Sequence, residues 1–449
     1  MLGRKRTWRG KAAIVAAIIF TLFISIYYLR LGPPNKSTYI GERRVAVKKE
    51  QGRYLLYKEG KPFEIRGGAG YKFTDELLRC GGNTLICWDT AKLAAVLEDA
   101  SQHQLMVIIG IDVPGVQYFD GYHNTPKVDS LFAATTALIS RYKDHPALLA
   151  WCLGNELKFP NSISYDPFYV AYNKLLAMIH ANDPHHPVCT TVINVSKNNI
   201  VNIRWRVPAI DFIGLNIYNS IRTLDTDLSF LKVFWNGPYF VSEWAPRGGW
   251  ESNTTSWKAP IEKNSTDKAQ DYYDFYTRHM PLQDPRFLGS LVFYWGSRQE
   301  YTPTFYSIFS ENGTPTEIME TMKDCWSGNK TQHVSPQLVD MNIDQQLHPQ
   351  DNIMLNAGSA HSAAIQVKTT AADSLSYHWE LLKEDWSSWG KVWVHFKKPM
   401  PEPQAFINDS LSAVTFRVPA KEGPYRLFVT VSNARGFCAN ANIPFYVIQ

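Results

Sequence analysis

Two segments of the chain end in carboxylates and hold the residue types that could do chemistry. Residues 147–157 begin with an apolar run of six or seven residues, and Gly-Asn-Glu follows, which places Asn155 and Glu156 at the end of the run. Residues 237–246 contain a second short apolar run, and this one stops at Glu243. Paired carboxylates that face each other across a cleft are what the cleavage of a glycosidic bond requires. One acid protonates the leaving oxygen, and the other carboxylate attacks the sugar or activates water.

An apolar run without alternation is typical of a strand that is buried on both faces, and in parallel α/β folds the carboxyl ends of such strands carry the active site. Eight strand patterns are present, and they span 63–66, 84–87, 106–111, 148–153, 188–193, 212–216, 239–242 and 290–294. Helical patterns lie between them, for example over 90–103, 127–142, 168–181 and 267–279. This alternation predicts an α/β fold, a (β/α)8 TIM barrel over residues 46–328.

The composition changes after the barrel. Residues 327–336 are polar and linker-like, and beyond them the helical patterns give way to alternating strand patterns. Their spacing predicts a small all-β, immunoglobulin-like sandwich over residues 336–449. Three tryptophans of this region could stack on sugar, although a structural role is favoured for them; they are Trp386, Trp389 and Trp393.

The N-terminal 29 residues have the pattern of a membrane anchor. Residues 1–11 hold five basic side chains and are expected to form a cytoplasmic tail, and residues 12–29 follow without a charge. Such a run is just long enough to span a bilayer, so it predicts a single transmembrane signal anchor, followed by a stalk over 30–45. A cleaved signal peptide is the alternative, but no small-x-small cleavage site follows the run. In both cases the body of the protein is expected outside the cytoplasm, in a periplasmic, extracellular or lumenal space.

The overall composition excludes some classes of protein. The 449-residue chain has a net charge of +5, and most of this excess lies at the N-terminus, so no nucleic-acid-binding surface is predicted. The aromatic content of 13% suits a sugar-binding cleft and equally suits the packing of a large barrel. The six cysteines show no CxxC or Cys/His ligand spacing, so neither a metal nor another cofactor is expected.

Residues 144–156, Asp-His-Pro-Ala-Leu-Leu-Ala-Trp-Cys-Leu-Gly-Asn-Glu, carry a family resemblance. This segment resembles the end of strand four in the large clan of retaining TIM-barrel glycoside hydrolases, which includes the β-galactosidase and β-glucuronidase catalytic domains. The similarity continues in the same order along the chain at 60–67, 211–218, 242–244 and 293–296. The resemblance implies a barrel enzyme that cleaves β-glycosidic bonds through a covalent intermediate.

Carried over residue by residue, the resemblance implies that Glu156 is the acid/base and Glu243 the nucleophile. Asn155 would hold the sugar 2-hydroxyl, Tyr218 would donate to the nucleophile, and Trp295 would form the floor under the bound ring. Glu156 must then be kept neutral to donate its proton, whereas Glu243 must stay ionised to attack. The competing structural interpretation is that the Asn-Glu pair caps a helix and that the two aromatic residues only line the barrel rim.

Further residues at the strand ends are candidates for substrate binding, namely Trp88, Asp89, Asp112, Asn216 and Trp244. The two aspartates equally fit the capping of loops or helices. The chain departs from the clan at Trp88 and Asp89, because many members place an arginine at the end of strand two. Arg66 or Arg247 could supply that positive charge instead.

These features together predict a membrane-anchored retaining glycoside hydrolase that acts on an oligosaccharide or polysaccharide by double displacement. A cell-surface glucan transglycosylase would use the same two glutamates, and aromatic residues in acceptor positions would favour it; the candidates are Tyr118, Trp244 and Trp250. A non-catalytic glycan-binding or scaffold protein is the third possibility. Both glutamates and Asn155 argue against it, since binding alone needs no acid opposite a nucleophile. The missing arginine argues mildly for it.

Overall fold

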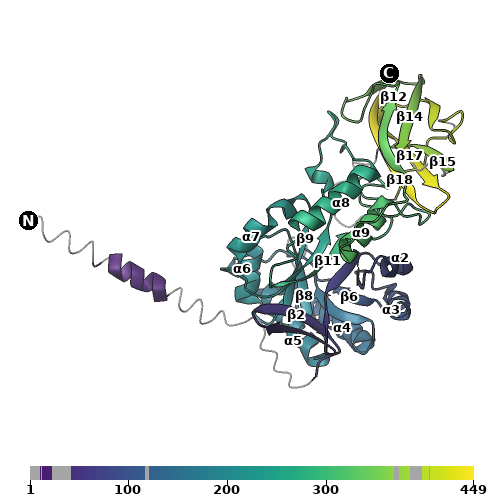
Figure 1. Ribbon diagram of the computed structural model, residues 1–449. Coiled ribbons are helices and arrows are strands. Elements are labelled where there is room, and N and C mark those ends of the chain that lie inside the picture. Colours follow the sequence, from purple (N-terminus) through teal and green to yellow (C-terminus); the bar gives the residue numbers. More distant parts are fainter. Residues whose placement is uncertain are drawn as a thin grey trace, which may run out of the picture.

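A computed structural model describes residues 11, 13–22, 42–116, 121–368, 374–384, 397–403 and 405–449. Eight parallel strands close into a barrel in the order β10-β11-β4-β5-β6-β7-β8-β9, which confirms the predicted TIM barrel (Figure 1). These strands are β4 (Ile65–Ala69), β5 (Thr84–Cys87), β6 (Met106–Ile111), β7 (Leu148–Leu153), β8 (Val188–Ile193), β9 (Phe212–Ile217), β10 (Tyr239–Trp244) and β11 (Phe287–Phe293). Every residue of β6, β7 and β9 is buried, as an apolar run covered on both faces requires.

Helices cover the outside of the barrel. They are α2 (Thr74–Arg79), α3 (Leu93–Gln102), α4 (Thr125–Tyr142), α5 (Asp166–Asn182), α6 (Lys197–Arg206), α7 (Leu224–Leu231), α8 (Ser265–His279) and α9 (Glu317–Ser327). Two of them begin at an asparagine cap: Asn124 accepts from the backbone N–H of Lys127, and Asn264 accepts from that of Asp267. Short 3-10 turns add Gly121–His123, Ile163–Tyr165, Asn219–Thr223 and Gly249–Glu251.

The first barrel strand lies later in the chain than its pattern indicates. The predicted strand at 63–66 is replaced by β4, which runs to Ala69. The two glycines inside β4 allow close approach, because a Cβ on Gly67 would lie 1.7 Å from the carbonyl oxygen of Thr84, and one on Gly68 would lie 2.2 Å from Cβ of Trp295. The two glycines therefore lie inside the strand, although in the sequence pattern they indicated its end.

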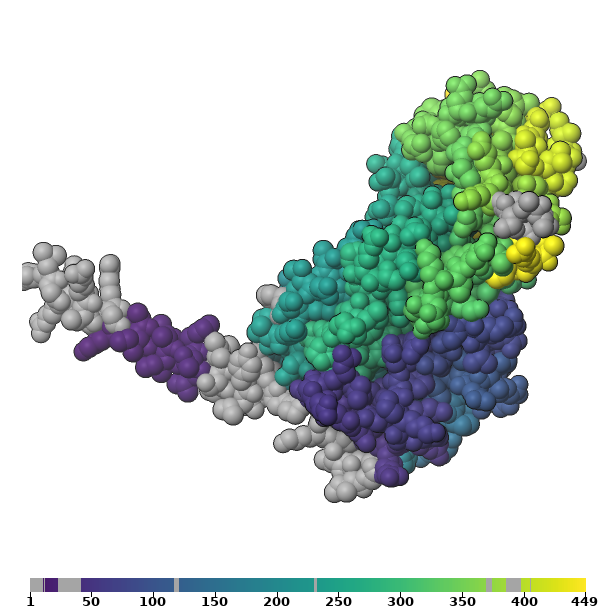
Figure 2. Space-filling view, viewed as in Figure 1, coloured from purple at the N-terminus to yellow at the C-terminus, as the bar shows by residue number. Residues whose placement is uncertain are grey.

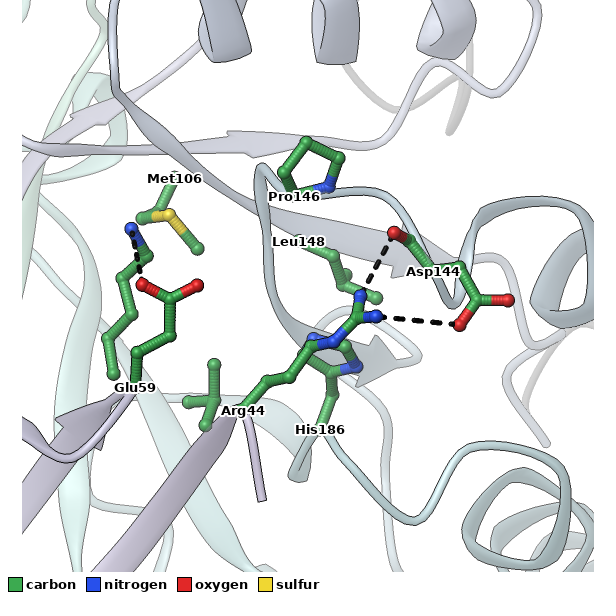
Figure 3. A pocket seen from close by; sticks show the side chains of 9 residues that line it. Arg44, Glu59, Met106, Asp144, Pro146, Leu148 and His186 are labelled. Carbon is green, nitrogen blue, oxygen red and sulfur yellow. Dashed lines mark hydrogen bonds and ion pairs between the residues drawn. The ribbon is translucent and has the colours of Figure 1, made fainter. Parts of the chain in front are cut away.

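A three-stranded antiparallel sheet lies against the amino ends of the barrel strands. It consists of β1 (Val45–Glu50), β2 (Arg53–Lys58) and β3 (Lys61–Phe63). The backbone N–H of Val45 donates to the carbonyl of His185, and that of Tyr54 donates to the carbonyl of Pro285. A pocket of about 290 Å³ remains between sheet and barrel (Figure 3), where Arg44 reaches Asp144. The sheet thus covers the pole of the barrel opposite to the carboxyl ends of its strands.

The C-terminal region is an all-β domain, as predicted. One sheet contains β12 (Gln337–Ile343), β14 (Ala360–Lys368) and β16 (Ala413–Arg417); the other contains β13 (Met354–Asn356), β18 (Cys438–Ile448), β17 (Gly423–Asn433) and β15 (Leu375–Lys383). The two sheets enclose a core of their own, centred on residues such as Trp379, Leu427 and Phe445. The tryptophans predicted to stack on sugar or to be structural, Trp386, Trp389 and Trp393, lie outside the described residues.

The all-β domain, called the sandwich below, packs directly on the barrel (Figure 2). Its strands contact α8 and the loop before α9: the N–H of Leu338 donates to Thr266 Oγ1, and the N–H of Cys438 donates to the carbonyl of Pro315. The polar segment 327–336, expected to be a linker, is docked instead. His333 lies between Glu317 and Asp324 of α9, at 2.9 and 3.0 Å.

Residues 13–22 form an exposed helix at the N-terminus. Among the described residues, no helix has the length and apolar character needed to cross a membrane. The predicted span over 12–29 falls only in part on described residues, so the anchor stays a prediction.

Candidate active site

Four neighbouring strands of the barrel wall are linked by hydrogen bonds at their carboxyl ends. Glu156 follows β7, and its backbone N–H donates to Thr191 Oγ1 of β8 at 3.0 Å. Asn216 of β9 donates from Nδ2 to Glu156 Oε1 at 3.0 Å, and its own Oδ1 accepts from Ser242 of β10 at 2.6 Å. Glu243, the next residue of β10, is in register with Asn216. The barrel therefore brings the two predicted glutamates to one site.

The backbone at Glu156 is held in an unusual conformation. Glu156 has a φ of 52°, in the left-handed region that disfavours side chains, directly beyond Gly154 with a φ of 83°. The hydrogen bond to Thr191 fixes this turn. Strained backbone of this kind is concentrated at functional sites, where the surrounding structure stabilises it. In this conformation the Glu156 carboxylate accepts a hydrogen bond from Asn216.

Asn155 is oriented by the same polar groups. Its Oδ1 accepts from Thr191 Oγ1 at 2.7 Å and from Asn216 Nδ2 at 3.2 Å. With its oxygen engaged, the amide NH2 of Asn155 is the part of the side chain left to donate to a ligand. That orientation suits the predicted contact with a sugar hydroxyl.

Burial controls the ionisation of both glutamates. Burial is the main cause that raises the pKa of Glu156; the hydrogen bond from Asn216 opposes it, and the charge of Glu300 adds to it. The pKa of Glu243 is raised to about 8, first by burial and then by the charge of Glu156. The charge of either carboxylate opposes the ionisation of the other, so the pair loses its two protons in separate steps. The pair can therefore supply one acid and one carboxylate, as glycoside cleavage requires.

Aromatic residues surround Glu243. The hydroxyl of Tyr218 lies 3.4 Å from Glu243 Oε2 and donates to it, as predicted for this residue type and position. The Tyr218 ring contacts Phe293 and Tyr306 edge-on or tilted, with centroids 5.9 and 5.8 Å away. Trp250 lies 5.0 Å from the Tyr218 ring, and 60% of its surface is exposed. This tryptophan presents an open aromatic face beside Tyr218, which donates to Glu243.

The loop between β11 and α9 adds two charged residues that the sequence patterns missed. Arg298 Nε and Glu300 Oε2 form an ion pair at 2.7 Å, and we call these two residues the loop pair. The charge of Arg298 lowers the pKa of Glu243, whereas that of Glu300 raises it. The guanidinium also lies over the rings of Phe293 and Tyr294, at 5.6 and 5.7 Å. Arg298 is thus the positive charge for which the end of strand two offers no residue.

The two arginines proposed for that charge from the sequence take other places. Arg66 donates to the carbonyl of Trp326 and pairs with Glu64 at 3.4 Å, so the expectation for Arg66 is wrong. Arg247 is exposed on the loop after β10. The sequence signal that could have indicated Arg298 is a basic residue shortly after the last barrel strand, since Arg298 follows the end of β11 by five residues.

Two predicted binding tryptophans are buried away from the site. Trp295 is 0% exposed; its Nε1 donates to the carbonyl of Phe73, and its ring packs against Phe309 and Trp326. Trp244 is also 0% exposed, and its ring packs against Tyr272 and Tyr276 of α8. Successive side chains of a strand alternate in direction, so Trp244 points outward because Glu243 points inward. The predicted roles of both tryptophans are therefore corrected.

The remaining candidates lie at the ends of β5 and β6. The Trp88 ring covers Gly110, where a Cβ would lie 2.0 Å from it. Asp89 accepts from the hydroxyl of Tyr71 at 3.1 Å and from the N–H of Ala91, and it pairs with Lys92 at 3.7 Å. These bonds give Asp89 the structural role of fixing its own loop. Asp112 is exposed just beyond β6, and Tyr118 lies outside the described residues.

No group of three His, Cys, Asp or Glu side chains within the described ranges is arranged to hold a metal ion. The site as built from these residues is one of carboxylates, amides and aromatic rings.

Comparison with known proteins identifies the fold. No family model matches the chain. A GH2 β-galacturonidase from Eisenbergiella tayi, solved bound to galacturonate, aligns with a TM-score of 0.50 and 13% identity over 66% of this chain and 55% of that one. The fold that the two chains share is the TIM barrel. An endo-β-1,4-mannanase from Thermotoga petrophila aligns with a TM-score of 0.45 and 12% identity over 87% of this chain and 99% of that one.

Curated relatives are glycoside hydrolases as well. Mannan endo-1,4-beta-mannosidase F of Aspergillus clavatus is 33% identical over 113 residues, which is 22% of this chain and 26% of that protein. A probable mannan endo-1,4-beta-mannosidase F of Aspergillus flavus is 30% identical over 109 residues, 21% of this chain and 23% of that protein. The matches thus span about a quarter of the length of these relatives. The predicted resemblance to the glycoside hydrolase clan is confirmed.

Proposed function

We propose that this protein is a retaining glycoside hydrolase that cleaves β-glycosidic bonds of an oligosaccharide or polysaccharide by double displacement. The observation that carries the proposal is the pair of half-buried glutamates at the carboxyl ends of β7 and β10. Asn216 donates a hydrogen bond to Glu156, and Tyr218 donates one to Glu243. Two carboxylates that repel each other in a partly buried site are costly to maintain, and a structural barrel rim has no need of them.

In the first step Glu243 attacks the anomeric carbon while Glu156 protonates the leaving glycosidic oxygen. The bond to the leaving sugar breaks with its electron pair, and an ester between Glu243 and the sugar forms. In the second step Glu156, now a carboxylate, takes a proton from water; the oxygen attacks the anomeric carbon, and Glu243 leaves as a carboxylate. Arg298 and the Tyr218 hydroxyl favour the ionised form of Glu243 at the start and end of the cycle.

The substrate is proposed to extend over several sugar units. Trp250 offers a largely exposed ring next to Tyr218, and such a face can stack on a neighbouring sugar. The curated relatives are named for mannan, a β-1,4-linked polymer, and the solved β-galacturonidase holds a uronic acid. Manno-oligosaccharides and β-uronides are therefore the first substrates to try.

A transglycosylase is the second candidate. The same exposed Trp250 could hold an acceptor sugar, which would then intercept the covalent intermediate in place of water. The third candidate, a silent glycan-binding scaffold, is opposed by the raised pKa values of both glutamates, because binding alone does not need a carboxylate that keeps its proton. We further propose that residues 12–29 anchor the protein in a membrane with the barrel on the extracytoplasmic side, and that the sandwich is immunoglobulin-like.

The test is turnover of the full-length protein with aryl β-glycosides, manno-oligosaccharides and β-glucan oligosaccharides, beside Glu243→Gln. Products that keep the β configuration in the first minutes of an NMR time course would support a retaining mechanism, and longer products would indicate transfer. A 2-deoxy-2-fluoro glycoside of the active sugar should add its mass to the peptide with Glu243. Inverted products, or equal rates for the variant, would refute the proposal.

A further inference from the structure

The loop pair is carried by the long loop between β11 and α9, which contacts the barrel at Gly249 and the sandwich at Asn442. Between β11 and α9 the chain makes a tight turn in which the N–H of Glu300 donates to the carbonyl of Thr302 and the N–H of Thr302 donates back to that of Glu300. Tyr301 at the turn has a φ of 64°. Because Glu300 and Thr302 are joined by these two backbone hydrogen bonds, contacts that hold Thr302 in place also hold Glu300.

Thr302 is fixed by a buried carboxylate at the boundary between the barrel and the sandwich. Its hydroxyl donates to Glu262 Oε2 at 2.6 Å, and the hydroxyl of Thr304 donates to Glu262 Oε1 at 2.8 Å. Lys268 of α8 pairs with the same carboxylate and also donates to the carbonyl of Thr304. Burial would raise the pKa of Glu262, but Lys268 and Arg426 overcome it and hold this pKa below its usual range.

Arg426 of β17 supplies the sandwich side of this network and is 1% exposed. Its guanidinium donates to the carbonyl of Pro260 at 2.7 Å, two residues before Glu262, and to Glu384 and Asn442 at 2.6 Å each. Asn442 in turn reaches Thr304 at 3.4 Å. Charge-assisted hydrogen bonds from a buried arginine are strong, and these tie the sandwich to the segment before α8 that carries Glu262.

We propose that the sandwich is part of the catalytic apparatus: Arg426, acting through Glu262 and Thr302, positions the loop pair beside the nucleophile. The inference rests on the proposed glycosidase function. Arg426 is a positioning residue, because it contacts neither the substrate site nor the two catalytic candidates, Glu156 and Glu243. The sandwich is then more than a recognition module attached to a self-sufficient barrel.

The groups that face Glu243 define what a displaced loop would change. They are Glu156 beyond β7, Tyr218 beyond β9, and Arg298 and Glu300 of the loop. Moving the loop pair away removes one cation and one anion together, while Glu156 and Tyr218 stay. We therefore expect a lower kcat with little change in KM, and a changed pH profile, because the arginine over the Phe293 ring no longer stabilises the ionised nucleophile.

The test compares two isosteric variants of the full-length protein. Thr302→Val removes the hydroxyl that reaches Glu262, a contact within the barrel domain. Thr266→Val removes a barrel–sandwich hydrogen bond, the one accepted from Leu338, without touching the loop. We expect Thr302→Val to lower kcat about tenfold and Thr266→Val to leave it unchanged. Arg426→Met, which keeps the volume of the side chain, should act like Thr302→Val.

Hydrogen exchange followed by mass spectrometry gives a readout that does not depend on turnover. Peptides covering residues 296–306 should exchange faster in Thr302→Val and Arg426→Met than in Thr266→Val. Unchanged exchange in Arg426→Met would overturn the inference, as would faster exchange without a loss of kcat. If the unaltered protein cleaves no glycoside, the proposed function fails, and the exchange data still decide whether the sandwich holds the loop.

Discussion

Asn216 of β9 donates a hydrogen bond of 3.0 Å to Glu156, which follows β7, and this contact joins the acid/base candidate to the strand beside β10, which carries the nucleophile candidate Glu243. The Oδ1 atom of the same amide accepts a hydrogen bond from the hydroxyl of Ser242, the residue before Glu243. Asn216 is fully buried, so it keeps one orientation without help from a ligand. Its amide therefore sets both where Glu156 lies and how readily it holds a proton.

Replacing Asn216 by alanine should raise the pKa of Glu156, because the hydrogen bond that lowers it is lost. The limb of the pH profile of kcat/KM that reports loss of the acid proton should move to higher pH, and kcat should fall by about 10- to 100-fold as Glu156 loses its orientation. The profile can be measured with an aryl β-glycoside. An unmoved basic limb would show that Asn216 does not act on Glu156.

Replacing Arg298 by methionine should shift the opposite limb. Arg298 lowers the pKa of Glu243, so its removal raises that pKa, and the protonated nucleophile persists to higher pH. We expect the acidic limb of kcat/KM to move upward by about half a pH unit to one unit. The control is Arg247→Met, which removes the same charge from the exposed loop after β10. Equal shifts in both variants would point to net charge rather than to position.

Glu243→Gln should stabilise the fold at alkaline pH. The pKa of Glu243 is about 8 in the folded protein against an ordinary 4.5, so the folded state holds a proton that the unfolded state releases. Stability from this group is present below pH 4.5 and is lost as the pH rises towards 8. A neutral glutamine avoids that loss, and we expect a gain of about 2 kcal/mol in the free energy of unfolding at pH 8. Urea titrations at pH 5 and pH 8 would measure it; a gain of equal size at both would contradict the explanation.

Trp250→Ala should weaken binding of long substrates more than of short ones. Its exposed ring lies beside Tyr218, and we expect it to stack on a sugar beyond the one attacked. Loss of one stacking contact should raise KM for oligosaccharides by about three- to tenfold and leave aryl monoglycosides unaffected. Trp205→Ala on α6 serves as the control for losing a partly exposed tryptophan. Equal effects on both substrate lengths would place Trp250 outside the binding cleft.

The strand ends were the part of the site that the sequence could predict. Asn155 and Glu156 close an unbroken apolar run, and the chain direction of a buried parallel strand then places them at the active pole. Alternation within a strand also separates Glu243 from Trp244, although the sequence interpretation did not apply it to the tryptophan. Trp295 lies two residues past the end of β11, so strand alternation does not predict its direction; its backbone N–H donates to the carbonyl of Ala69, and its side chain is buried.

The charged loop and the domain contact could not be predicted in the same way. Arg298, Glu300 and Thr302 lie in a loop without hydrophobic periodicity, so no pattern indicates which way they point. Glu262 and Arg426 are 164 residues apart, and only the packing of two domains brings their charges together. Contacts of this kind depend on the relative placement of whole elements, about which local patterns carry no information.

The small sheet beneath the barrel bears on how a tethered molecule would be oriented. Val45 enters the fold at the amino ends of the strands, bonded to His185, while both glutamates lie at the carboxyl ends. A tether ahead of residue 42 is thus attached to the base of the molecule. If residues 12–29 sit in a bilayer, the catalytic mouth opens away from the lipid surface, towards polymers in the surrounding space rather than towards the headgroups of the membrane that holds it.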